Sequence, residues 1–321
     1  MKNKILIVGG DPNSINSEIL IKTWRKLNTS LRKRIILISN YDLISKQIKL
    51  LKLPTKISLV KDINQNKGEE SLKILNINLN FRNPFKVDKN SASHFIKKSL
   101  NTAHNLALKN DVMGIINCAI DKNLLGRKKI GVTEYLAAKC KIKNNSEVML
   151  IKNKFLSVCP ITTHIDVREV SKKLNKHLIV NKVKTINHWF KKNLGKKPSI
   201  GVLGLNPHNA EYRKNSEEVR IIIPAIKKCK ALGANITGPL VSDNIFIKDY
   251  KNYDVLIGMY HDQVLSPFKS LFKFDAINIT LGLKYIRLSP DHGTAYKLIK
   301  KNMADPTSLI KCLNFFKNLK K

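Results

Sequence analysis

The 321-residue sequence has few acidic groups and no long apolar run. No apolar stretch approaches the roughly 20 residues that a transmembrane helix needs. Near the N-terminus, the apolar segment Ile5–Val8 is too short to be the core of a signal peptide. These absences predict a protein that does not enter a membrane and that is located in the cytoplasm.

Cysteine is also sparse, because the chain has only five and none of them forms a CxxC motif. An odd, scattered set argues against a disulfide framework and against a cysteine-based zinc site. We therefore expect reduced and mostly buried thiols at Cys118, Cys140, Cys159, Cys229 and Cys312.

The lack of acidic residues leaves a formal net charge of +36 at pH 7. Such an excess is typical of proteins that bind nucleic acid, but those proteins concentrate lysines around aromatic stacking residues. Here the lysines are dispersed, and the denser stretches Lys46–Lys56 and Lys191–Lys197 are not interleaved with several aromatics. We expect no specific nucleic-acid binding, and instead a positive field that attracts an anionic, phosphorylated metabolite.

Short β-branched runs alternate with longer amphipathic stretches along the chain. The nearly continuous apolar run Val112–Ala119 is typical of a strand that is buried on both faces. The alternation predicts an α/β fold with a largely parallel sheet. Expected helices include Ser17–Leu27, Ser91–Lys109, Ser216–Leu232 with a kink at Pro224, and Thr294–Asn302.

Three histidines, His164, His208 and His261, each follow a strand-like apolar run and lie in a polar, non-helical context. Open α/β sheets bind ligands at the carboxyl ends of their strands. Three imidazoles that converge there would hold one divalent metal and leave positions open for a substrate. Their wide separation fits no local metal motif, so the fold must assemble the site.

Other polar groups have two interpretations each. Asn278 and Arg287 lie within apolar strands and need partners, either an anionic substrate group or a structural salt bridge. Asp243 is either a site carboxylate at a strand end or an ordinary cap or turn residue. The loop Gly9–Pro12 is either a weak phosphate-binding loop or, as we favour, a tight turn.

The segment Asp291–Ala295 is expected to open a helix. Backbone N–H groups at a helix start can hold a phosphate or a ribose. The alternative is an ordinary helix cap that uses the side chain of Thr294.

Several motifs occur in order over nearly the whole chain. They include Thr162-Thr163-His164, Asn206-Pro207-His208, Tyr260-His261-Asp262-Gln263 and Asp291-His292-Gly293-Thr294-Ala295. On these motifs the sequence resembles the 4-hydroxythreonine-4-phosphate dehydrogenase family of pyridoxal phosphate (vitamin B6) biosynthesis. The resemblance implies that NAD or NADP oxidises 4-phosphooxy-L-threonine to 2-amino-3-oxo-4-phosphooxybutanoate, which then decarboxylates to 3-amino-2-oxopropyl phosphate.

The resemblance also implies a two-domain α/β/α sandwich like that of isocitrate and isopropylmalate dehydrogenases. With approximate boundaries, residues 1–127 plus 285–321 would form the cofactor-side domain. Residues 128–284 would carry the metal and the interface of a homodimer.

The family's functional residues transfer to matching positions of this sequence. One divalent metal (Zn, Mg or Co) would be bound by His164, His208 and His261, two from one subunit and one from the other, so that the active site is shared. The implied substrate contacts are Thr133, Lys269, Asn278 and Arg287, with the Val132 position and Asp243 as further candidates. The cofactor would lie near His292, Gly293 and Thr294. No residue is assigned as the general base.

One departure from the family motif concerns the substrate. Val132 stands where the family usually has a substrate-binding histidine, and valine donates no side-chain hydrogen bond. A sibling dehydrogenase for another phosphorylated hydroxy acid or an aromatic cis-diol is therefore a second hypothesis. A catalytically lapsed, basic nucleic-acid-binding protein is the third, and the three intact histidines argue against it.

Overall fold

The computed structural model describes residues 3–65, 68–109, 112–126, 131–142, 146–273, 275–317 and 319. The chain divides into two compact units, Met1–Cys140 with Lys284–Asn318, and Lys141–Leu283 with Leu319–Lys321. The first unit continues to Cys140, beyond the boundary predicted near residue 127. The reason is helix α5 (Val132–Lys139), whose Val132 and Tyr135 pack against the core of the first unit.

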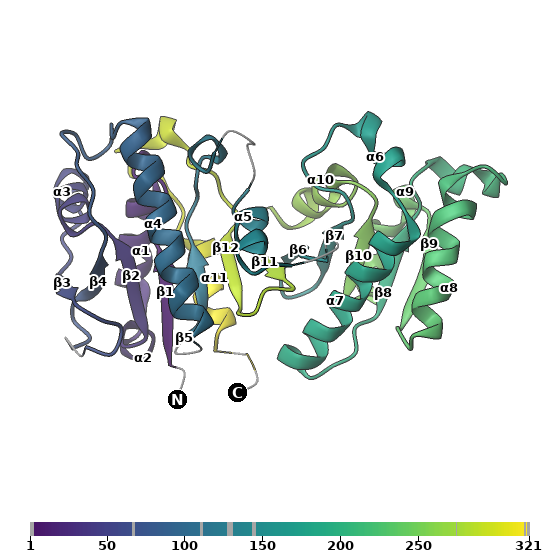
Figure 1. Ribbon diagram of the computed structural model, residues 1–321, viewed down its shortest axis with the longest axis horizontal. Coiled ribbons are helices and arrows are strands. Elements are labelled where there is room, and N and C mark those ends of the chain that lie inside the picture. The colour runs from purple at the N-terminus through teal and green to yellow at the C-terminus, as the bar shows by residue number, and fades with distance from the viewer. Residues whose placement is uncertain are drawn as a thin grey trace. The chain divides into compact units, whose positions relative to one another are not determined.

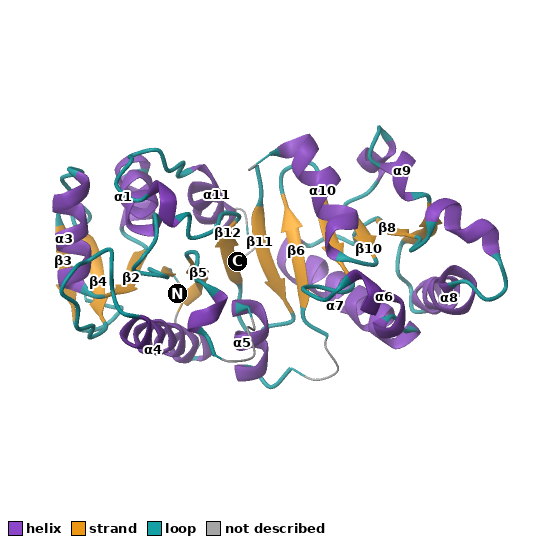
Figure 2. Cartoon of the chain, turned by 90° about the horizontal axis from the view of Figure 1, so that it is seen from above, coloured by secondary structure: helices purple, strands orange, loops and turns teal. Residues whose placement is uncertain are grey.

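The described strands of the first unit form a parallel array in the order β3-β4-β2-β1-β5-β12. Every residue of β2 is buried. Helices cover both faces of the whole array: α4 (Lys89–Leu108) and α5 lie on one face, and α1 (Asn16–Lys26) and α11 (Thr307–Phe315) lie on the other (Figure 2). The strands are β1 (Lys4–Val8), β2 (Ile35–Ser39), β3 (Ile57–Val60), β4 (Leu72–Asn76), β5 (Val112–Asn117) and β12 (Arg287–Pro290).

Helix α4 crosses one face of this array (Figure 1) and buries Phe95 and Ile96 in the main core of the unit. Its start is capped by Asp88, whose side chain accepts from the backbone N–H of Ser91. The helices are α1 (Asn16–Lys26), α2 (Thr29–Arg32), α3 (Tyr41–Leu51), α4 (Lys89–Leu108), α5 and α11 (Thr307–Phe315), with a short turn η1 (Lys122–Leu124).

The described strands of the second unit follow the order β11-β6-β7-β10-β8-β9. Strand β6 is antiparallel to both its neighbours, and the run β7-β10-β8-β9 is parallel. The α/β class with a largely parallel sheet is thus confirmed. The strands are β6 (Val148–Lys152), β7 (Ser157–Pro160), β8 (Ile200–Leu203), β9 (Ile236–Leu240), β10 (Val255–Gly258) and β11 (Ile277–Leu281).

Helices α7 and α8 lie on one face of these strands and α10 on the other (Figure 2). The predicted helix Ser216–Leu232 begins as a π-helical turn, η3, and becomes regular only around Pro224, which has no N–H for a helical bond. The helical elements are α6 (Val167–Lys173), α7 (Lys176–Leu194), η2 (Pro207–Tyr212), η3 (Glu218–Ile222), α8 (Ile223–Ala231), α9 (Ser242–Ile245), η4 (Asp249–Asn252) and α10 (His261–Phe272).

The helix predicted over Thr294–Asn302 does not form. Only the single turn η5 (Tyr296–Leu298) is helical, and Ala295, Lys300 and Asn302 have positive φ angles of 44°, 65° and 55°. A right-handed helix cannot continue through such residues. Thr294 is therefore not a helix cap; its carbonyl instead accepts a hydrogen bond from the N–H of Ile15.

All five cysteines are free and buried, as the sequence predicts. Within the described ranges, no helix combines the length and the apolar character that crossing a bilayer requires.

A buried histidine of the first unit should make stability depend on pH. His104, on α4, is 5 % exposed, and its Nδ1 lies 2.8 Å from the hydroxyl of Tyr285. Burial, reinforced by the positive charges of Lys139 and Lys284, lowers the pKa of His104 below its ordinary value of 6.5. Below that value the imidazole takes up a proton more readily in the unfolded chain than in the folded chain. The free energy of unfolding therefore decreases as the pH is lowered.

We expect the free energy of unfolding to decrease between about pH 7.5 and about pH 5, and to decrease less in His104→Gln. Urea unfolding at the two pH values measures both quantities. His94→Gln, at an exposed position of the same helix, is the matched control and should keep the wild-type slope. Equal slopes for all three proteins would show that His104 is not linked to folding.

Candidate active site

The candidate metal ligands follow three neighbouring strands of the second unit. Strand β10 pairs in parallel with β7 on one side and with β8 on the other. The carboxyl ends of these strands therefore lie at one edge of the array, where open α/β sheets bind ligands. His164 follows β7, His261 begins α10 directly after β10, and His208 follows β8.

His164 and His261 lie side by side. Their ring centroids are 5.8 Å apart, with an angle of 38° between the ring planes. The Nδ1 atom of His261 lies 2.7 Å from a carboxylate oxygen of Asp262. A proton on Nδ1, shared with that carboxylate, leaves the Nε2 lone pair available to a metal, as is usual for metal-bound histidines.

His208 lies in a left-handed turn of the backbone. Residues 208 to 212 all have positive φ angles, between 48° and 56°, and none of them is glycine. Each such residue costs roughly 1–2 kcal/mol, so the surrounding structure must hold the turn in place. The side chain of His208 is 67 % exposed, and its Nε2 lies 3.9 Å from a carboxylate oxygen of Asp243.

Buried polar side chains hold the chain on both sides of His208. The fully buried carboxylate of Glu218 accepts hydrogen bonds of 2.8 Å from the N–H groups of Leu205 and Asn206. Burial alone would raise the pKa of Glu218, but these donors hold it below its ordinary value of 4.5. The buried Asn209 donates to the carbonyl of Pro239, 3.2 Å away. The strained turn is thus anchored in a fixed position, which is typical of functional sites.

No group of three or more His, Cys, Asp or Glu side chains is arranged to hold a metal within the described residues of one chain. Two potential metal ligands lie side by side, the imidazoles of His164 and His261, and the carboxylate of Asp262 contacts the second of these rings. Imidazole suits Zn²⁺ and Co²⁺ better than Mg²⁺, which prefers oxygen ligands. The pair therefore fits two positions of a nitrogen-rich metal site, and His208 is not part of it within the same chain.

Arg287 and Thr133, two of the predicted substrate-binding residues, contact each other in the first unit. Arg287, 3 % exposed at the start of β12, donates from NH1 to the Thr133 hydroxyl over 3.3 Å and from Nε to the Asn117 side-chain oxygen over 2.6 Å. Burial lowers the pKa of Arg287 to about 10, so the guanidinium remains charged at neutral pH. Asn117 was not among the predicted residues, although its position at the end of a buried apolar strand was a usable signal.

Two further predicted contacts lie in the second unit. Asn278, on β11, has a buried Oδ1 atom to which no described residue donates. Such an acceptor normally has a partner, so it fits a ligand that carries a donor group. Lys269 is exposed on α10.

Val132 and Asp243, the remaining candidates, lie in short helices. Val132 is the first residue of α5, and it is partly buried against the core of the first unit. Asp243 lies in the first turn of α9; the cap residue there is Val241, so Asp243 is not the N-cap. Asp243 keeps an exposed carboxylate next to His208, which is consistent with a site residue.

The predicted cofactor segment is a loop rather than a helix start. His292 is half-buried, its Nδ1 lies 2.9 Å from the carbonyl of Gly293, and no described residue pairs with its buried Nε2. Burial lowers the pKa of His292, so the ring is neutral at pH 7. The orphaned nitrogen fits a ligand group, whereas a phosphate site at a helix N-terminus is ruled out here.

The loop Gly9–Pro12 is a tight turn. Gly10 has a φ angle of 78°, and a Cβ atom there would lie 2.5 Å from the carbonyl of Ala119. The Asp11 carboxylate accepts a hydrogen bond from the N–H of Asn13 inside the turn. This glycine is explained by chain packing and needs no phosphate.

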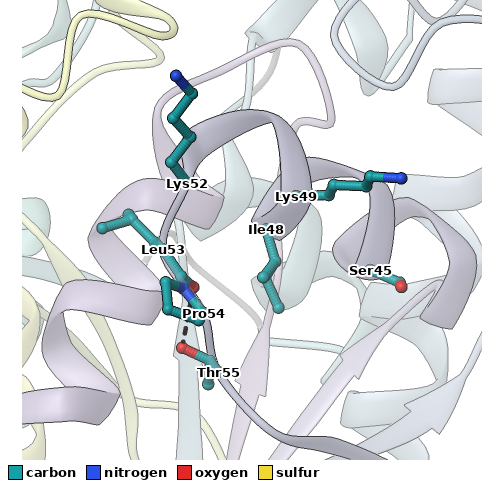
Figure 3. Close-up of a pocket in the computed structure, with 7 residues that line it drawn as sticks. All are labelled: Ser45, Ile48, Lys49, Lys52, Leu53, Pro54 and Thr55. Carbon is teal, nitrogen blue, oxygen red and sulfur yellow. Dashed lines mark hydrogen bonds between the residues drawn. The ribbon is translucent and has the colours of Figure 1, made fainter.

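A surface pocket lies at the end of α3 (Figure 3), away from every candidate residue. Its two lysine side chains point outward, and the carboxyl end of a helix does not attract anions. The lining residues are Ser45, Ile48, Lys49, Lys52, Leu53, Pro54 and Thr55.

Comparison with known proteins identifies the family. The family model described as "Pyridoxal phosphate biosynthetic protein PdxA" matches residues 31–316. A 4-hydroxythreonine-4-phosphate dehydrogenase from Sulfurihydrogenibium sp. is 36% identical over 97% of this chain and 96% of its own length. The crystal structure of the Klebsiella pneumoniae enzyme of the same name superposes with a TM-score of 0.87 and 27% identity, covering 99% of this chain and 98% of that one.

A more distant structure shares the fold alone. A terephthalate 1,2-cis-dihydrodiol dehydrogenase from Burkholderia xenovorans has a TM-score of 0.67 at 18% identity, over 99% of this chain and 98% of that chain.

Proposed function

The chain belongs to the family of pyridoxal phosphate biosynthetic protein PdxA, and from this premise we propose how it acts as a 4-hydroxythreonine-4-phosphate dehydrogenase. In the proposed reaction, a hydride passes from the hydroxyl-bearing carbon of 4-phosphooxy-L-threonine to NAD or NADP, and the hydroxyl proton leaves to a base. The product, 2-amino-3-oxo-4-phosphooxybutanoate, then loses CO₂ and takes up a proton at the α-carbon to give 3-amino-2-oxopropyl phosphate. The observation that carries the proposal is the imidazole pair at the strand ends.

We assign metal binding to His164, His208 and His261, and we favour Zn²⁺ or Co²⁺ because the donors are nitrogens. A bound metal would polarise the substrate oxygen and lower the pKa of the hydroxyl group. The protein's part is orientation: Asp262 fixes the His261 ring through Nδ1, and the buried Glu218 fixes the chain that precedes His208.

The substrate is an anion, so its binding requires cationic residues. We propose that Arg287 and Lys269 pair with its phosphate and carboxylate groups, and that the Thr133 hydroxyl holds the guanidinium of Arg287 in position. The unpaired Oδ1 atom of Asn278 would accept a hydrogen bond from the substrate ammonium group. The excess of lysine then serves to attract anionic metabolites rather than nucleic acid.

We propose that the dinucleotide is NAD or NADP, held in part by the loop of His292, Gly293 and Thr294. The cofactor carries out the hydride chemistry, and the protein supplies position and charge. Five free thiols are typical of a reducing compartment, which supports the cytoplasm as the location.

We further propose a homodimer in which one chain supplies His164 and His261 and its partner supplies His208. Two observations support this division. The first two histidines form a pair within one chain, and no described group of three ligands does. An isologous dimer of this kind contains two identical shared sites.

The function is tested by following reduction of NAD and NADP with a panel of substrates. The panel contains 4-phosphooxy-L-threonine, other phosphorylated hydroxy acids and an aromatic cis-diol. We expect turnover with 4-phosphooxy-L-threonine to exceed the others. A preference for the cis-diol would instead favour the sibling activity that Val132 suggests, and absence of turnover with every substrate would contradict a dehydrogenase.

The substitution Val132→His tests the residue that departs from the family motif. Because Val132 is only partly buried, we expect the histidine to be tolerated. A restored donor should add about 1 kcal/mol of substrate binding, which lowers KM about fivefold and changes kcat little. Val132→Met, which adds bulk without a donor, is the control. Unchanged kinetics in Val132→His would show that this side chain does not face the substrate.

A further inference from the structure

Gln263, the last residue of the Tyr-His-Asp-Gln motif, contacts the ends of three strands at once. Its Oε1 accepts a hydrogen bond of 2.6 Å from the N–H of Met259, two residues before His261. Its Nε2 donates to the carbonyl of Gly204, 2.7 Å away, and to the hydroxyl of Ser242, 2.8 Å away. Gly204 begins the segment that leads to His208, and Ser242 directly precedes Asp243.

The backbone of Met259 extends the same network to the third histidine. Its carbonyl accepts hydrogen bonds from both the N–H of Thr162, at 3.1 Å, and the hydroxyl of Thr162, at 2.8 Å. Thr162 is two residues before His164. A single side chain thus contacts, directly or through the backbone of Met259, the segments that carry all three histidines.

The role goes beyond that of an ordinary helix cap. Gln263 is the third residue of α10, where a glutamine often accepts from the N–H of the cap residue, here Tyr260. In this protein it accepts from Met259 instead, and both Nε2 hydrogens point to other strand ends. Only a carboxamide supplies one acceptor and two donors in this arrangement.

We propose that Gln263 is a positioning residue that sets the histidine-bearing segments for metal binding without touching the metal or the substrate. This inference rests on the metal site assigned under the proposed function. Residues that hydrogen-bond to the surroundings of metal ligands increase the affinity for the metal, because they fix the orientation of the ligands before the ion binds. Loss of the two donor bonds should therefore weaken metal binding even where the fold survives.

The discriminating substitution is Gln263→Glu, which keeps the acceptor and suits a helix N-terminus but loses both donors. A simple capping role predicts no effect on metal affinity. The positioning role predicts that metal-free protein binds Co²⁺ at least about tenfold more weakly, with a similar loss in Gln263→Met. Gln47→Glu is the matched control: Gln47 is a buried glutamine of the first unit that donates to the carbonyls of Pro12 and Pro84.

Co²⁺ titration of the metal-free wild type, both Gln263 variants, Gln47→Glu and His261→Ala decides the question. We expect weaker binding in the Gln263 variants and unchanged binding in Gln47→Glu. Wild-type affinity in Gln263→Glu, or loss of cooperative unfolding in both Gln263 variants, would overturn the positioning role. Wild-type affinity in His261→Ala would contradict the metal site itself, and the role of Gln263 toward it would then fall as well.

Discussion

His208→Ala is expected to abolish turnover while it leaves the fold intact. If His208 is a ligand as proposed, its loss removes several kcal/mol of transition-state stabilisation, which corresponds to a decrease in kcat/KM on the order of 10³ or more. The side chain is 67 % exposed, so its removal should change the free energy of unfolding by only about 0.5 kcal/mol. Steady-state kinetics and urea unfolding measure the two effects separately.

His177→Ala is the matched control, since His177 is an exposed histidine of the same unit, on α7. It should keep wild-type turnover and wild-type stability. Wild-type turnover of His208→Ala in protein stripped of metal would remove His208 from the site.

Mixing two inactive variants should restore activity if the proposed dimer shares its sites, and the pair that does so identifies the ligand supplied by the partner subunit. We expect recovery when His208→Ala is mixed with His261→Ala under conditions that exchange subunits. In each mixed dimer one site carries both lesions and the other carries none. Random exchange makes half of the dimers mixed, so roughly a quarter of all sites should recover.

The control is a mixture of His164→Ala with His261→Ala. These two rings lie together within one chain, so every site keeps a lesion and no activity should return. Recovery in this second mixture and none in the first, with subunit exchange confirmed, would contradict the proposed division of ligands. No recovery in either would place all three histidines in one chain.

The sequence pattern predicts the parts of the fold that depend on regular burial. Apolar runs such as the one at β5 are buried because helices cover both faces, and this periodicity is visible without a structure. Strand β9 is less predictable, because Gly238 and Pro239 weaken its pattern. Proline is tolerated there because β9 lies at the edge of the array.

Local backbone geometry explains the errors and omissions. Residues 294–302 have the cap-like threonine and apolar spacing of a helix, but positive φ angles at Ala295 and Lys300 prevent it. The left-handed turn that carries His208 contains no glycine, so the residue types there do not predict its backbone conformation. Tertiary contacts impose both conformations, and single-sequence reasoning does not include those contacts.

The sequence predicts a set of candidate residues but not their geometry. The sequence shows that each of the three histidines follows a strand-like run. The proximity of His164 to His261, in contrast, depends on the strand order β7-β10-β8. Likewise, the position of Arg287 in an apolar strand indicates that it needs a partner. Only the fold shows that Asn117 and Thr133 are among those partners.

The most direct test of a metal-dependent dehydrogenase is the rate of NAD or NADP reduction with 4-phosphooxy-L-threonine before and after metal removal. We predict turnover in the untreated protein, its loss after chelation, and its return when Zn²⁺ or Co²⁺ is added back. Undiminished turnover in protein shown to be free of metal would contradict the account.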